Sequence, residues 1–170
     1  MFQALARLLR LAATAAFVVA AAPAMAASQP TQFTGTYKIA IDPSVSLQDA
    51  ADSMRLRANA LNLKLVAELP LSKQVEAMTG SPQRTITIFQ FCDAMTAKEL
   101  IDLNLDFSVY MPCRIAMIEN TQGQGWLVMM DVNTDSVAKD KKLPKALKQK
   151  IEEVRAALID VMRAGASGDL

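Results

Sequence analysis

Two cysteines are the side chains of this 170-residue chain best suited to chemistry, because the chain contains no histidine. Cys92 ends the segment FQFC, and Cys113 lies in the segment MPCRI. Three interpretations stay open: a structural disulfide, two buried thiols that act as small core residues, and a redox or ligand-binding site. A disulfide would close a loop of about 20 residues and stabilise the fold by ~3 kcal/mol in the loop-entropy model.

The lack of histidine limits the enzyme classes that the chain can belong to. It excludes a Ser-His-Asp triad, a Cys-His pair, an imidazole zinc ligand and the usual haem-attachment motif. Gly123 and Gly125 lie in a predicted hairpin turn and not between a strand and a helix, so they form no phosphate loop. We recognise no catalytic motif, and the sequence favours a non-enzyme without deciding the question.

A thiol redox enzyme is the competing class. Such enzymes usually carry Cys-x-x-Cys at a helix N-terminus, where the helix dipole lowers the thiol pKa. Cys92 directly precedes a predicted helix, whereas Cys113 does not. Arg114 is next to Cys113 in sequence, but we expect it to point to the other face of the strand. It is therefore poorly placed to lower the pKa of the Cys113 thiol.

Methionines near Cys113 raise the question of a soft metal. Met111 and Met117 share strand parity with Cys113, and thioethers with a thiolate suit Cu(I). Met129 points to the other face in the register that we expect. Methionine is also a common gap-filler of cores, so this set is equally a piece of core. We predict no definite cofactor, and Cu(I) and haem are the candidates to test.

The first 26 residues have the features of a secretory signal. Arg7 and Arg10 precede a short apolar run over residues 11–22, and Ala24-Met25-Ala26 forms a small-x-small cleavage site. The run is shorter than the about 20 residues that cross a bilayer, so we expect no stable membrane span after cleavage. We expect cleavage between Ala26 and Ala27 and a periplasmic or secreted protein; an uncleaved anchor is the alternative.

Cleavage leaves 144 residues, and the loss of two arginines changes the net charge from +1 to −1. A near-neutral chain lacks the basic patch that nucleic acids or anionic membrane surfaces require. This length suits one domain with its own core. We expect a lead-in over residues 27–34, a single domain over 35–163 and a flexible tail over 164–170.

The apolar pattern predicts a strand-helix order of β-α-β-(α)-β-α-β-β-α. This order is typical of an α+β fold, a single two-layer domain with a mainly antiparallel sheet of about five strands and three main helices. The expected strands are residues 35–41, 63–69, 84–92, 111–120 and 125–133. The expected helices begin at Ser46, 71, 94 and 142, and the last of them ends at Arg163.

The last hairpin has an expected register in which Glu119 lies opposite Trp126. Arg114 then faces Asp131 as an opposite-charge pair that would support the cysteine site. The face of Cys113 would also carry Ile115, Met117, Val128, Met130 and Val132. The other face is apolar too, so the sheet needs cover on both sides, from helices, a ligand or a second subunit.

The segment FQFCDAMTAKELIDLNLDFSVYMPCRIAMIE resembles the domain of unknown function 302 family. The resemblance spans Tyr37 to Asn133, and the helix to Arg163 also suits it. The residues that carry it are Phe91-Cys92, Met111-Pro112-Cys113-Arg114-Ile115, Glu119 and Asp131-Val132-Asn133. Asp93-Ala94 stands where the family often has an Asn-Pro-like pair, and the turn TQGQG differs from the usual Asp/Gly turn. The resemblance implies a small α+β fold and no established activity.

We therefore expect an exported binding or accessory protein with a site near Cys92 and Cys113. Its partner would be an unknown small ligand, a metal or a periplasmic redox protein. A periplasmic thiol redox enzyme and a structural interaction module with a stabilising disulfide are the alternatives. A homo-oligomer stays open.

Overall fold

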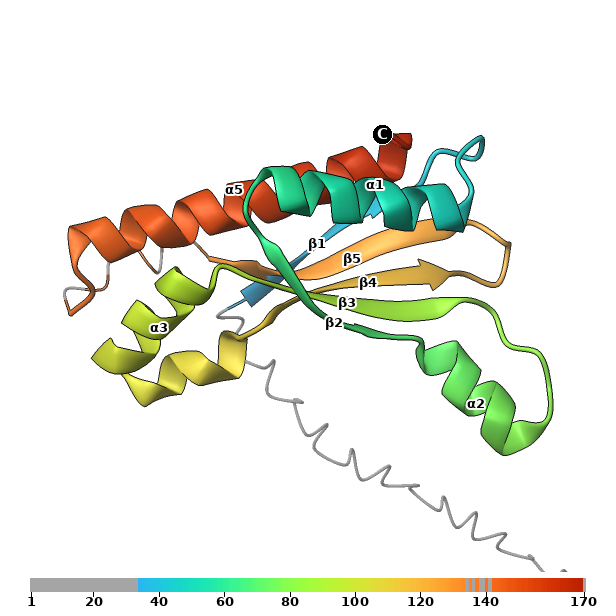
Figure 1. Ribbon diagram of the computed structural model, residues 1–170, viewed down its shortest axis with the longest axis horizontal. Coiled ribbons are helices and arrows are strands. Elements are labelled where there is room, and N and C mark those ends of the chain that lie inside the picture. Colours follow the sequence, from blue (N-terminus) through green and yellow to red (C-terminus); the bar gives the residue numbers. More distant parts are fainter. Residues whose placement is uncertain (1–33, 134, 136, 138–139, 141, 170) are drawn as a thin grey trace, which may run out of the picture. The chain divides into compact units, whose positions relative to one another are not determined.

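The structure is a computed structural model that describes residues 34–169 except 134, 136, 138–139 and 141. The expected signal peptide and residues 27–33 of the lead-in lie outside the described residues. The elements follow the predicted order, and the α+β class is confirmed (Figure 1). They are β1 (Thr34–Ala40), α1 (Leu47–Ala60), β2 (Lys64–Leu69), α2 (Leu71–Thr79), β3 (Ile86–Cys92), α3 (Ala94–Leu103), the 3₁₀ helix η1 (Leu105–Tyr110), β4 (Cys113–Glu119), β5 (Gly125–Val132) and α5 (Lys145–Ser167).

In the described part of the chain, five strands form one sheet in the order β1-β5-β4-β3-β2. All neighbouring strands run antiparallel. β2 is an edge strand, and its pairing with β3 contains an irregularity between Leu65 and Ala67. Because β4 lies at the centre of the sheet, the strand that begins with Cys113 is paired along both sides.

Short polar side chains fix where the helices begin and end. The Ser46 hydroxyl accepts from the Asp49 N–H of α1 and donates to the Asp49 carboxylate, so Asp takes the usual Glu or Gln place of a capping box. Asn62 follows α1 with φ 59°, the left-handed conformation that ends helices. At α3, the Asp93 carboxylate accepts from the N–H groups of Met95 and Thr96.

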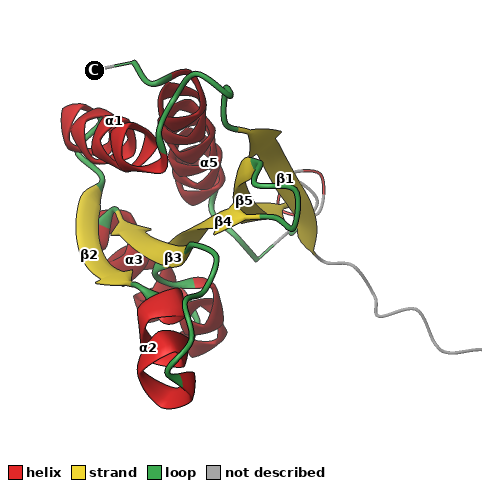
Figure 2. Cartoon of the chain, turned by 90° about the vertical axis from the view of Figure 1, so that its right-hand side faces the viewer, coloured by secondary structure: helices red, strands yellow, loops and turns green. Residues whose placement is uncertain are grey.

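The main core lies between the sheet and the pair α1 and α5. Figure 2 shows these two helices on one side of the sheet and α2 and α3 on the other. The sheet side of this core consists of buried side chains that alternate along the three central strands. They are Phe89, Phe91, Ile115, Met117, Leu127 and Met129.

The expected register of the last hairpin is wrong by one residue. Glu119 lies opposite Gly125, and Ile118 lies opposite Trp126. The reason is the turn, in which the Asn120 side-chain oxygen accepts from the N–H groups of Gln122 and Gln124. A one-residue shift moves a whole strand to the other face, so Leu127 and Met129 face the core in place of Val128 and Met130.

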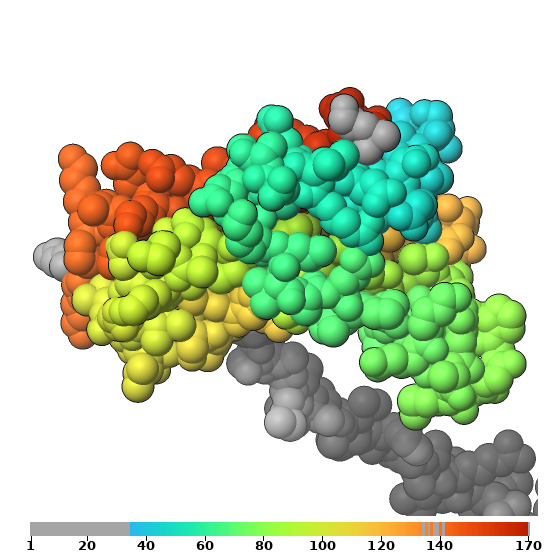
Figure 3. Space-filling model, viewed as in Figure 1, coloured from blue at the N-terminus to red at the C-terminus, as the bar shows by residue number. Residues whose placement is uncertain are grey.

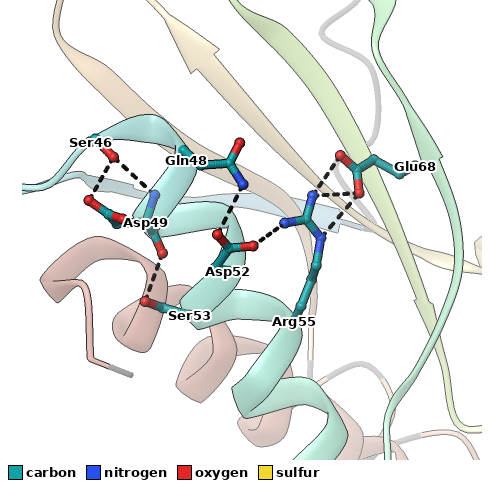
Figure 4. A network of polar contacts seen from close by, with 7 residues as sticks. All are labelled: Ser46, Gln48, Asp49, Asp52, Ser53, Arg55 and Glu68. Carbon is teal, nitrogen blue, oxygen red and sulfur yellow. Dashed lines mark hydrogen bonds and ion pairs between the residues drawn. The ribbon is translucent and has the colours of Figure 1, made fainter.

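A network of polar contacts joins α1 to the edge strand β2. The Arg55 guanidinium contacts the Glu68 carboxylate at 2.7 Å and that of Asp52 at 2.6 Å (Figure 4). Arg55 also lies over the ring of Phe89, 5.5 Å from its centroid. One side chain thus links α1, β2 and the core.

The C-terminal helix is longer than the sequence indicates. α5 continues past Arg163 to Ser167, and the three residues after Arg163 are buried. Gly165 lies against α1, where a Cβ would be 2.5 Å from Met54 Cγ and 3.1 Å from the Ala50 carbonyl oxygen. The expected flexible tail therefore contributes a close helix contact that only glycine permits.

The second face of the sheet is partly covered. α2 contacts β3, and the Ser72 hydroxyl of α2 accepts from the Ile86 N–H at 3.2 Å. In the space-filling view α2 protrudes at the end of the sheet away from α3 and η1 (Figure 3). Elsewhere on this second face of the sheet, the side chains are half-buried: Ile88, Ala116, Ile118, Trp126 and Val128. No helix in the described ranges combines the length and the apolar character needed to cross a membrane.

Candidate functional site

A pocket of about 320 Å³ lies at the end of the sheet where β3 and β5 finish and β4 begins. Its walls come from these strand ends, from α3 and η1, and from the N-terminal half of α5. In Figure 1 α5 extends past the end of α1 and over α3, which leaves this end of the sheet between them. Both cysteines line the pocket.

The wall of the pocket is mainly apolar. Much of it belongs to a second hydrophobic cluster, distinct from the main core, that joins α3 and η1 to α5. The members that line the pocket are Leu100, Phe107, Met111, Val137, Leu143 and Ile151. Of these wall residues, the sequence indicated only Met111 as part of a candidate site. The segment that contains Phe107 and Tyr110 has neither a helical nor a strand period, so the sequence did not indicate that it lines a pocket.

The two cysteines reach the pocket from different directions. Cys113 lies opposite Phe91 in the pairing of β3 with β4, whereas Cys92 is the next residue along β3. Because successive strand side chains point to opposite faces, Cys92 leaves the sheet on the face opposite to Cys113. Both are free, half-buried thiols in this structure.

The surroundings hold both thiols in their neutral form. Burial raises the pKa of Cys92, and the adjacent Asp93 charge raises it further. Burial, with a smaller contribution from Cys92, raises the pKa of Cys113 to about 11, against the opposing effect of Arg114. Because the thiolate is the nucleophile, both cysteines are poor nucleophiles near pH 7.

The predicted metal-binding set is only partly brought together. Met111 lines the pocket with Cys113, but Met117 is buried in the main core. Met129 and Met130 both line the pocket, although we expected Met129 to point away from Cys113. Within the described ranges, no three His, Cys, Asp or Glu side chains are grouped so that they could hold a metal ion.

The expected pair between Arg114 and Asp131 is wrong. Asp131 instead accepts two hydrogen bonds from Arg155 of α5, at 2.5 and 2.8 Å. The register explains the change, because Asp131 shares the face of Met129 that lies against α5. Arg114 lies opposite Gln90 of β3 and is exposed at the pocket.

Asp93 combines a structural role with its place in the pocket wall. Its carboxylate caps α3 and accepts from the Thr96 hydroxyl at 2.8 Å. Burial alone would raise the pKa of Asp93, but hydrogen bonds from Thr96 and the α3 backbone hold it below its ordinary value. Asp93 is therefore ionised at neutral pH, and its charge is directed into the cap of α3.

Comparison with known proteins agrees with the fold. The family model "Domain of unknown function DUF302" matches residues 37–164, and the chain belongs to this family. A crystal structure of an uncharacterized conserved DUF302 protein from Bacillus stearothermophilus is similar, with a TM-score of 0.61 and 14% identity. The match covers 78% of this chain and 98% of that chain, and at this identity it shows the fold. No curated protein matches the chain significantly.

The ion pair of Asp131 can be tested by a double-mutant cycle. We expect Asp131→Asn and Arg155→Gln to be coupled by about 1 kcal/mol in the free energy of unfolding, because the pair is bidentate and only partly exposed. The matched cycle of Asp131→Asn with Arg114→Gln should give a coupling within error of zero. Urea unfolding measures both. Coupling to Arg114 in place of Arg155 would contradict the register of β4 and β5.

The raised pKa of Cys113 predicts a pH dependence. In iodoacetamide labelling followed by site-resolved mass spectrometry, we expect the rate at Cys113 to keep rising between pH 9 and about 11. Because the folded pKa exceeds the unfolded value of 9.0, the thiol stabilises the fold below pH 9, and this stabilisation is lost as the pH rises through about 11. The difference in the free energy of unfolding between the wild type and Cys113→Ser should therefore decrease between pH 9 and about 11. A labelling rate that levels off below pH 9 would contradict the burial of this thiol.

Proposed function

We propose that this protein binds a small, mainly apolar molecule in the pocket at the end of the sheet. The observation that carries the proposal is one cavity of about 320 Å³ with an apolar wall and a few polar side chains, into which both cysteines open. Ligand pockets typically have this character, with volumes of about 300–1,000 Å³. The pocket is at the small end of this range, which favours a ligand of modest size.

The neutral thiols support binding over thiol catalysis. A redox enzyme needs a cysteine that ionises near the working pH, and both thiols have raised pKa values. Neutral thiols act as small polarizable wall residues that suit an apolar ligand. The proposal includes export, supported by Arg7, Arg10, the apolar run and the Ala24–Ala26 cleavage motif, so that binding takes place in the periplasm or outside the cell.

A pocket-filling variant tests this proposal. Ala97 of α3 lines the pocket, whereas Ala94 of the same helix is exposed and does not. We expect calorimetric titration of the wild type with decanol to show binding with a negative heat-capacity change. Ala97→Phe should weaken this binding at least tenfold, because the added ring occupies the cavity.

The matched variant Ala94→Phe adds the same ring outside the pocket and should bind decanol as the wild type does. Thermal unfolding of both variants shows whether each one is folded. The proposal fails if the folded wild type binds no decanol, or if Ala97→Phe binds it as well as Ala94→Phe.

A soft metal such as Cu(I) is the second candidate, and it rests on a different observation. Among the described residues, five side chains that line the pocket carry sulfur: Cys92, Met111, Cys113, Met129 and Met130. Thiol and thioether sulfur are the donors that Cu(I) prefers. The sequence contains no competing imidazole.

Anaerobic competition with a Cu(I) chelator tests this candidate. We expect Met129→Leu to weaken Cu(I) binding, because it removes a sulfur atom from the pocket and keeps a side chain of similar volume. Met117→Leu is the control, since Met117 lies in the main core, as Met129 does, but does not line the pocket. Equal loss in both variants, or no binding by the wild type, would rule the metal site out.

A further inference from the structure

The charged side chains around the pocket differ in whether they have hydrogen-bond or ion-pair partners. Asp93 caps α3, and the Asp140 carboxylate accepts from the Lys142 N–H at 2.8 Å. Arg155 forms the bidentate pair with Asp131. Arg114 differs, because its side chain has neither a hydrogen bond nor an ion pair with any of the described residues.

Arg114 is also well placed to meet a ligand. It follows Cys113 directly at the start of β4 and lines the pocket together with Met130 and Tyr110. Its neighbour across the strand pair, Gln90, is uncharged. A guanidinium carries up to five N–H donors in a planar fork that matches a carboxylate or a phosphate.

Apolar surface continues outward from the pocket. Phe107 and Tyr110 of η1 belong to the wall, and Leu105 and Val109 of the same helix are exposed. An elongated apolar molecule could therefore extend from the cavity along η1. A hydrated polar head group would then lie at the rim of the pocket, near the exposed guanidinium of Arg114.

We infer that the ligand is an amphipathic anion, with an apolar body in the pocket and an acidic head group on Arg114. This inference rests on the proposed function, because it names the chemical class of the same ligand. The apolar wall around the rim lowers the local dielectric and strengthens the charge-assisted hydrogen bonds between the guanidinium and the head group.

Three probes with a ten-carbon chain test the inference: decanoate and decyltrimethylammonium below their micelle-forming concentrations, and decanol below its solubility limit. Calorimetric titration of the wild type should give a dissociation constant for decanoate roughly tenfold lower than for decanol. Decyltrimethylammonium should bind more weakly than decanol, since its head group is repelled by Arg114.

Variants of Arg114 separate its charge from its bulk. Arg114→Gln should abolish the preference for decanoate over decanol, whereas Arg114→Lys should keep part of this preference. Arg163→Gln is the matched control, because Arg163 is exposed on α5 and does not line the pocket. It should bind all three probes as the wild type does.

The outcomes distinguish this inference from the proposal beneath it. If decanol and decanoate bind equally well, or if Arg114→Gln keeps the preference, the inference is wrong and the apolar pocket stands. Tightest binding of decyltrimethylammonium would also overturn it and would assign the head group to Asp93 or Asp140. If no probe binds the wild type, the proposed function falls, and the inference falls with it.

Discussion

The pairing of β4 with β5 is the constraint on which the rest of the structure depends. The Asn120 side chain holds the turn between them, so Gly125 lies opposite Glu119 and the two strands are fixed to the residue. This register puts Leu127 and Met129 on the core face beside Phe89 and Phe91 of β3. The same register turns Asp131 towards Arg155 of α5 and leaves Arg114 on the opposite face of the sheet. A slip of one residue would exchange these faces and remove both the core and the ion pair.

The pocket follows from the length of α5. The C-terminal half of this helix packs on α1 and the sheet through residues such as Leu158 and Val161, with Gly165 at the closest approach. Its N-terminal half extends beyond α1 and packs through Leu147 and Ile151 on α3 and η1. The main core packs on the sheet, whereas the second cluster joins α5 to α3 and η1, and the pocket lies at the strand ends between the two clusters. The thiols and Arg114 meet here because β3 ends and β4 begins at this place.

The fold could largely be predicted from the sequence, because its signals are local. Alternating apolar residues indicated the strands, Ser46 indicated the start of α1, and the resemblance to the DUF302 family agreed with the order. The errors concern how these elements pair and pack against one another. The register depended on a side-chain bond in the turn, and the run Ala164-Gly165-Ala166 has the composition of a frayed end although close packing on α1 requires small residues. The cysteine neighbourhood was predicted, whereas the apolar wall from α3 and η1 was not, since nothing in their sequence indicates a cavity.

The central claim is that an apolar ligand enters the pocket between α3, η1 and α5. The eight methionines of the described residues provide direct reporters, since three line the pocket and the others do not. Protein labelled with ¹³C at the methionine methyl groups would be titrated with decanol and followed by NMR. We expect the signals of Met111, Met129 and Met130 to shift together and saturate, while those of Met54, Met78 and Met162 stay in place. Shifts confined to Met78 on the exposed side of α2, or no saturable shift at the three pocket methionines, would contradict the account.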